Sequence, residues 1–136
     1  MKSSLYYYLT QDAGIISAVS SRIYRSTAPT GSTMPYIVMN YVGAEPSYDQ
    51  SGRNDYFKRT VEFLCVGNTP DSCDTLAEAV KSALDIQVVE IGDTGDKTHI
   101  FATTFLSEFD DFDLIPASES AEYTITQNYE ISYKEA

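Results

Sequence analysis

The C-terminal part of the sequence alternates apolar and polar side chains, and this pattern constrains the fold more than any other feature. Between residues 122 and 134, apolar side chains occupy alternate positions at Tyr123, Ile125, Tyr129, Ile131 and Tyr133. Successive side chains of a β-strand point to opposite faces of a sheet, so this segment is predicted to be a strand with one buried and one solvated face. Such strands are typical of antiparallel sheets.

Further strands are predicted from short runs of β-branched and aromatic residues. They cover residues 22–24, 36–42, 57–66, 86–91 and 98–109. Between two of these runs, residues 43–56 include Gly43, Pro46, Gly52 and Asn54. Because these residue types favour turns, the segment is predicted to be a long loop.

The clearest helix is predicted over residues 70–84. Thr69 is suited to cap its first turn and Pro70 to occupy its first position, while apolar side chains recur at helical spacing along one face. A broken amphipathic helix is predicted over residues 3–19, where Gly14 interrupts the pattern. Together these elements predict an α+β fold, a mostly antiparallel β-sheet with a long helix and a short N-terminal helix packed on one face.

The chain is acidic, and this property disfavours two classes of function. Nine Lys and Arg residues stand against twenty Asp and Glu residues, for a net charge of −11. Nucleic-acid readers and proteins that dock on anionic membranes both need clustered positive charge. The charge is also uneven, since residues 1–60 hold six basic and four acidic side chains and residues 61–136 hold three and sixteen. The length favours a single domain spanning residues 1–136.

Targeting segments and a disulfide framework are not expected. The apolar stretches are a few residues long, too short for a secretory signal or a membrane span. Cys65 and Cys73 are the only cysteines, which is too few for a disulfide scaffold or a four-ligand zinc site. We expect reduced, packed thiols in a protein made in the cytoplasm.

Residue types that carry catalysis are scarce. His99 is the only histidine, and no glycine motif for phosphate binding is present. The acidic run from Glu108 to Asp113 lacks the residue order of a calcium loop, so we interpret it as a solvated loop. The sequence therefore predicts no enzyme, no metal and no cofactor. The residues alone leave open a pairing of His99 with Cys65 or Cys73.

Four short motifs follow one another along the chain. They are Arg22-Ile23-Tyr24, Ala28-Pro29, Pro35-Tyr36-Ile37-Val38 and the helical segment from Asp74 to Leu84. Their order, across residues 5–133, resembles the tail-terminator (tail-completion) proteins of bacteriophages with long, non-contractile tails. The chain departs from that pattern in its longer acidic segment from Glu108 to Glu122.

The resemblance implies a structural protein of the virion, placed at the head–tail joint. Such proteins look like subunits of a ring, typically a hexamer, that caps the head-proximal end of the tail tube. The ring ends tube polymerisation and offers a docking surface to the head connector. The implied partners are further copies of the chain, the tail-tube protein and the head–tail connector protein. DNA is expected to pass through without specific binding, and neither a membrane partner nor a catalytic residue is implied.

Two groups of side chains are candidate functional surfaces. The candidate channel surface consists of Asp110, Asp111 and Asp113. Acidic side chains on a channel wall would repel DNA phosphates over about 10 Å at 0.1 M salt. The candidate subunit or tube interface consists of Tyr48, Arg53 and Tyr56. For this second group the alternative is a hairpin tip that contacts no partner.

Two other functions stay open at this stage. One is another head–tail connector component, such as a stopper or adaptor, or a tail-tube subunit, which shares the ring and differs in its partner. The more distant one is a small α+β ligand-binding module or enzyme, which needs a pocket with convergent polar groups.

Overall fold

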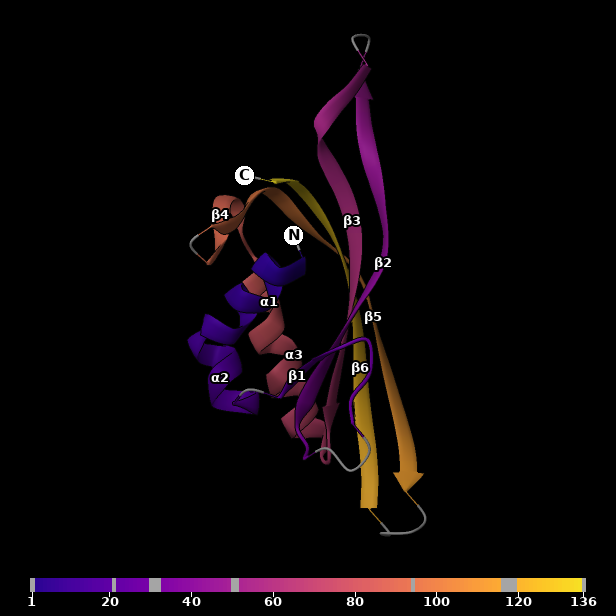
Figure 1. Ribbon diagram of the computed structural model, residues 1–136. Helices are drawn as coiled ribbons and strands as arrows, with labels where there is room; N and C mark the ends of the chain where they lie inside the picture. Colours follow the sequence, from indigo (N-terminus) through magenta and orange to yellow (C-terminus); the bar gives the residue numbers. More distant parts are fainter. Residues whose placement is uncertain are drawn as a thin grey trace.

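A computed structural model describes residues 2–20, 22–29, 33–49, 52–93, 95–115 and 120–135 of the chain. Six strands form one sheet in the order β1-β2-β3-β6-β5-β4. The helices lie on one side of this sheet and the other side is left open (Figure 1). The sheet curls so that β4, at one end of the strand order, reaches round to pack against the first helix.

The strands differ greatly in length, and the long ones extend past the body of the molecule at both ends (Figure 1). Their bounds are β1 Ile23–Arg25, β2 Tyr36–Asp49, β3 Gly52–Gly67, β4 Gln87–Asp93, β5 Asp96–Ile115 and β6 Ser120–Glu135. β1 pairs with β2 in parallel, and every other pair is antiparallel. The sheet is therefore mixed.

Three helices cover the inner face of the sheet: α1 Lys2–Gln11, α2 Ala13–Val19 and α3 Pro70–Leu84. The bounds of α3 confirm the predicted helix, and Thr69 caps it by accepting a hydrogen bond from the Ser72 amide at 3.1 Å. Asp12 separates the other two helices, because its backbone is extended and its carboxylate caps α2 at the Ile15 amide, 3.0 Å away.

The core fills the space between the helices and the inner face of the sheet. Phe63 lies at its centre with no exposed surface, and its ring meets the ring of Tyr129 edge-on at 5.6 Å. The inward positions of β6 are the apolar positions of the period-two pattern, which is confirmed there. Other fully buried core side chains are Leu5, Leu9, Ile15, Ile37, Met39 and Leu76.

The predicted fold class is wrong in two respects. The sheet is mixed and curled into a half-barrel, and it carries three short helices in place of one long helix and one short one. The parallel pair arises because the chain crosses from β1 to an adjacent β2 through residues 26–35, a connection long enough to bring it back to the same end. The curl brings β4 onto α1, which shares the inner space with α3.

The predicted loop over residues 43–56 is also wrong, since most of that segment belongs to the hairpin of β2 and β3. The paired positions run on from Gly43 and Thr60 to Asp49 and Gly52. Pro46 is accommodated because β2 is an edge strand here, where a missing N–H costs no ladder hydrogen bond. Two of the turn-forming residues, Gly43 and Pro46, stand beside the two bulges of the hairpin.

Candidate functional site

The predicted interface residues lie on the β2–β3 hairpin, which we call the arm (residues 42–59). Tyr48 and Arg53 are cross-strand partners near its end, and Tyr56 pairs with Lys134 of β6 where the arm joins the body. The side chains of Tyr48, Arg53 and Tyr56 lie outside the described residues. The backbone therefore places all three on one projecting element, which Figure 1 shows reaching well beyond the helices.

The predicted acidic surface is divided between the two faces of β5. Asp110 pairs with Ile125, a buried residue of the inner face, whereas Asp111 pairs with Thr124 of the outer face. Asp110 and Asp111 are exposed. The register of Asp113 follows that of Asp111, and its side chain lies outside the described residues. Asp110 and Asp111 therefore lie on opposite faces of the sheet.

A polar network that the sequence did not single out joins α3 to β5 and β6. The Gln127 amide is fully buried and donates to the Ala77 carbonyl at 3.2 Å and to Glu108 at 3.2 Å, and its oxygen accepts from the Tyr129 hydroxyl at 3.2 Å. Lys81 of α3 completes the network through an ion pair with Glu108 at 3.1 Å. The available signal was positional, because Gln127 occupies an inward position of the period-two pattern.

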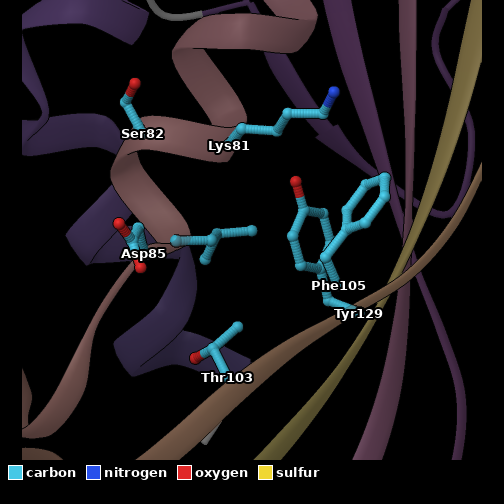
Figure 2. A pocket seen from close by; sticks show the side chains of 7 residues that line it. Lys81, Ser82, Asp85, Thr103, Phe105 and Tyr129 are labelled. Atoms are coloured by element: carbon cyan, nitrogen blue, oxygen red, sulfur yellow. The ribbon is translucent and has the colours of Figure 1, made fainter.

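A hollow of about 480 Å³ opens beside this network, between the end of α3 and β5 (Figure 2). Lys81 extends from α3 above the ring of Phe105, with its ammonium nitrogen 5.1 Å from the ring centre. The hydroxyl of Thr103, on the floor of the hollow, is buried and has no hydrogen-bond partner among the described residues. The lining is completed by Ser82, Leu84, Asp85 and Tyr129.

The residues considered for covalent chemistry do not come together. Cys65 and Cys73 are free and buried, and the Cys73 thiol donates to the Cys65 carbonyl at 3.0 Å. Burial raises the pKa of Cys73 to about 11 and raises that of Cys65 further, so both thiols are protonated at neutral pH. His99 pairs with Lys134, and Cys65 with Ile125 nine residues away along β6, so about 30 Å of strand separates them.

Within the described part of the chain, no group of three or more His, Cys, Asp or Glu side chains is arranged to hold a metal ion. Among the helices described, none has both the length and the apolar character needed to cross a bilayer.

Comparison with solved structures finds a similar fold in a chain of a virion particle. A chain from the virion of a native gene transfer agent particle superposes with a TM-score of 0.72 at 14% identity, covering 100% of this chain and 95% of that one. A second solved chain aligns with a TM-score of 0.48 at 12% identity, over 93% of this chain and 91% of that one. No curated protein sequence matches the chain.

The described part of the chain thus combines a curled mixed sheet with a projecting arm. The family model for tail completion protein gp17 matches residues 3–111, and the chain belongs to this family. This membership confirms the resemblance drawn from the sequence and gives the chain a structural role in the tail of a phage-type particle.

Proposed function

We propose that the protein forms a ring, a hexamer, on the head-proximal end of the tail tube. The ring ends tube polymerisation and presents a docking surface to the head–tail connector protein. Its partners are further copies of itself, the tail-tube protein and the connector, and DNA passes through the ring without specific binding. The protein is made in the host cytoplasm and resides at the head–tail joint of the virion.

Family membership is the observation that carries this proposal, since the matched region spans most of the chain. The arm supports it, because a hairpin that leaves its own body has the form expected of an element that contacts another subunit or the tube (Figure 1). The charges are also suitable for a passive channel, since the net charge of −11 disfavours adhesion to DNA.

The test uses tail tubes grown from purified tail-tube protein. We expect added protein to stop tube elongation at one end, and negative-stain images to show a cap at that end only. Protein that binds the connector and leaves tube growth unchanged would instead be a stopper or adaptor. Protein that joins the tube along its length would be a tube subunit.

Deletion of residues 47–54 shortens the arm and tests its part in assembly. We expect the shortened protein to fold and to lose oligomerisation or tube capping, because Tyr48 and Arg53 are removed. Unchanged oligomerisation together with unchanged capping would show that the arm has no partner.

A further inference from the structure

Three basic side chains gather around Tyr41, where the arm joins the body of the molecule. Lys2 of α1, Arg25 of β1 and Arg59 of β3 place their charged groups over its ring, 5.3, 5.8 and 5.4 Å from the ring centre. The Tyr41 hydroxyl donates to the Lys2 carbonyl at 3.2 Å and so ties the start of α1 to β2. We call Lys2, Arg25 and Arg59 the basic cluster. It brings together three of the nine basic residues of the chain.

The positive charge of the basic cluster is not balanced within the described part of the chain. None of its three side chains forms an ion pair with a described acidic residue. The Nε of Arg59 is buried and has no hydrogen-bond partner there. Tyr41 adds no negative charge, because burial raises its pKa to about 12 although Arg25 and Arg59 oppose the rise. A buried charged donor without an acceptor is costly, so the basic cluster is suited to receive an anion from outside.

Negative charge is concentrated at the end of the molecule opposite to the arm. Residues 108–122, which we call the acidic end, contain six acidic residues and no basic one. The strands β5 and β6 carry this charge past the helices (Figure 1). Asp110 pairs with Ile125, and Ile125 with Cys65, six residues from Arg59 along β3. About 20 Å of strand therefore separates the acidic end from the basic cluster of the same chain.

We infer that the basic cluster of one subunit receives carboxylates from the acidic end of the next subunit, so that the two charged ends of the chain meet head to tail in the ring. The inference rests on the proposed ring and names the surfaces that close it. Contacts between unlike patches are the type that closes a ring of identical subunits. Because six carboxylates share the acidic end, no single one of them is essential to the contact.

DNA phosphate is the other anion that a basic cluster can bind, and the charge of the whole chain disfavours it. Binding to DNA gains its strength from many positive contacts that displace counterions, and here three cations stand within a net charge of −11. A carboxylate needs only the one or two charge-assisted hydrogen bonds that a single arginine supplies. The exposed side chains of Lys2 and Arg25 leave the basic cluster open to such a partner.

The first test replaces Arg59 by methionine, which keeps an apolar stem and removes the charge. Arg59→Met is expected to raise the concentration of half-assembly about tenfold or more, the effect of one lost charge-assisted hydrogen bond. Its melting temperature should stay the same or rise, because a buried donor without a partner is removed. Lys58→Met is the matched control and should assemble as the wild type does. It removes the same charge from the next position of β3, which is exposed and faces the other side of the sheet.

Sedimentation at increasing NaCl concentration measures assembly, and thermal unfolding measures stability. Assembly of the wild type should weaken as salt screens the contact, and assembly of Arg59→Met should depend less on salt. Wild-type assembly in Arg59→Met would overturn the inference. If Arg59→Met is less stable or does not fold, Arg25→Gln decides, because Arg25 is exposed. It should weaken assembly about threefold, as expected for an exposed ion pair, and unchanged assembly in that variant would overturn the inference.

Cross-linking identifies the anion that the basic cluster receives. Arg25→Lys keeps the charge and supplies an amine, which a carbodiimide joins to a carboxylate in contact with it. In a mixture of isotopically labelled and unlabelled protein, we expect mixed cross-links between residue 25 and carboxylates of the acidic end. The reaction is run on free protein and on capped tail tubes. Absence of these cross-links from both samples, or cross-links to other acidic residues in their place, would overturn the inference.

A DNA arm of the experiment tests the other anion. Wild-type protein is mixed with a DNA duplex at 0.15 M salt, and we expect no binding. Duplex binding that Arg59→Met abolishes would assign the basic cluster to phosphate and overturn the inference.

These outcomes are distinct from those that test capping. If the wild type caps tubes and Arg59→Met caps them at the same concentration, the ring stands and the contact between charged ends is wrong. If the expected cross-links form in rings that never bind tube ends, the contact stands and the capping function is wrong.

Discussion

Gln127 is the residue on which the contact between α3 and the sheet depends most directly. It is fully buried. Its amide nitrogen donates to the Ala77 carbonyl of α3 and to Glu108 of β5, and its amide oxygen accepts from the Tyr129 hydroxyl. A buried polar group that loses its partner costs about 1–3 kcal/mol. Replacement of Gln127 by an apolar side chain would remove the hydrogen-bond partner of several groups at once.

We therefore predict that Gln127→Leu lowers the free energy of unfolding by about 2 kcal/mol or more, measured by urea denaturation. Asn128→Ala is the matched control, because Asn128 faces the outer side and donates to the Ser107 hydroxyl at 3.1 Å. Its loss should cost less than about 1 kcal/mol, since Asn128 and Ser107 are only half-buried. Equal losses for the two variants would contradict the role assigned to the buried amide.

The two cysteines give a second prediction at this scale. Burial holds the pKa of Cys73 at about 11 and that of Cys65 higher, so neither thiol supplies thiolate at neutral pH. Folded protein should leave an aromatic disulfide reagent unreacted at pH 7, and unfolded protein should react at both cysteines. Any reaction of the folded chain should increase as the pH rises towards 11. Val42→Cys places a thiol on the exposed arm and serves as the positive control; fast reaction of the wild type would refute the prediction.

At the scale of single residues, the sequence predicts inward positions well and polar partners poorly. Spacing alone predicts that Tyr123, Ile125 and Tyr129 lie on the buried face. Gln127 shares that spacing, but a polar side chain does not by itself predict burial. Its burial depends on Ala77 and Glu108, which are 50 and 19 residues away. Such partners are brought together only by the complete fold.

Among the elements, α3 is the one most fully specified by its own sequence. Thr69 caps it, Pro70 begins it, and its apolar stripe faces the sheet. We predict that Thr69→Ala lowers the free energy of unfolding by about 1 kcal/mol in urea denaturation, because the Ser72 amide loses its acceptor. Thr69→Ser keeps the hydroxyl and should retain most of that stability. A loss as large in the serine variant would show that the cap is not the cause.

The arm shows why the other elements were harder to predict. Gly43, Pro46 and Gly52 are turn formers, yet cross-strand pairing between β2 and β3 holds all three in an extended hairpin. Its register also depends on pairs that are distant in sequence, such as Gly43 with Thr60, which local composition does not record. The same limit applies to β1, whose three residues become a strand only because β2 lies beside them. Local signals thus located α3 and β6, and tertiary pairing decided the arm and the mixed sheet.

At the scale of the whole molecule, the sheet has two unlike sides and two unlike edges. The helices cover the inner face, and the outer face is open (Figure 1). If the open faces of the subunits line the channel of the proposed ring, the helices lie on the side away from the DNA. The candidate channel residues then belong to different faces of the sheet. Asp111 and Asp113 occupy outer-face positions of β5, and Asp110 occupies an inner-face position.

This arrangement predicts different effects for acidic residues that are neighbours in sequence. The double variant Asp111→Lys/Asp113→Lys should slow DNA release from assembled particles and lower their titre, because each lysine adds an attraction to phosphate of about 1 kcal/mol at 4 Å in water, repeated in every subunit. Asp110→Lys is the matched control and should release DNA at the wild-type rate, because its side chain lies on the helix side. DNA release is followed with an intercalating dye. Equal slowing by Asp110→Lys, or unchanged release by the double variant, would show that the outer face does not line the channel.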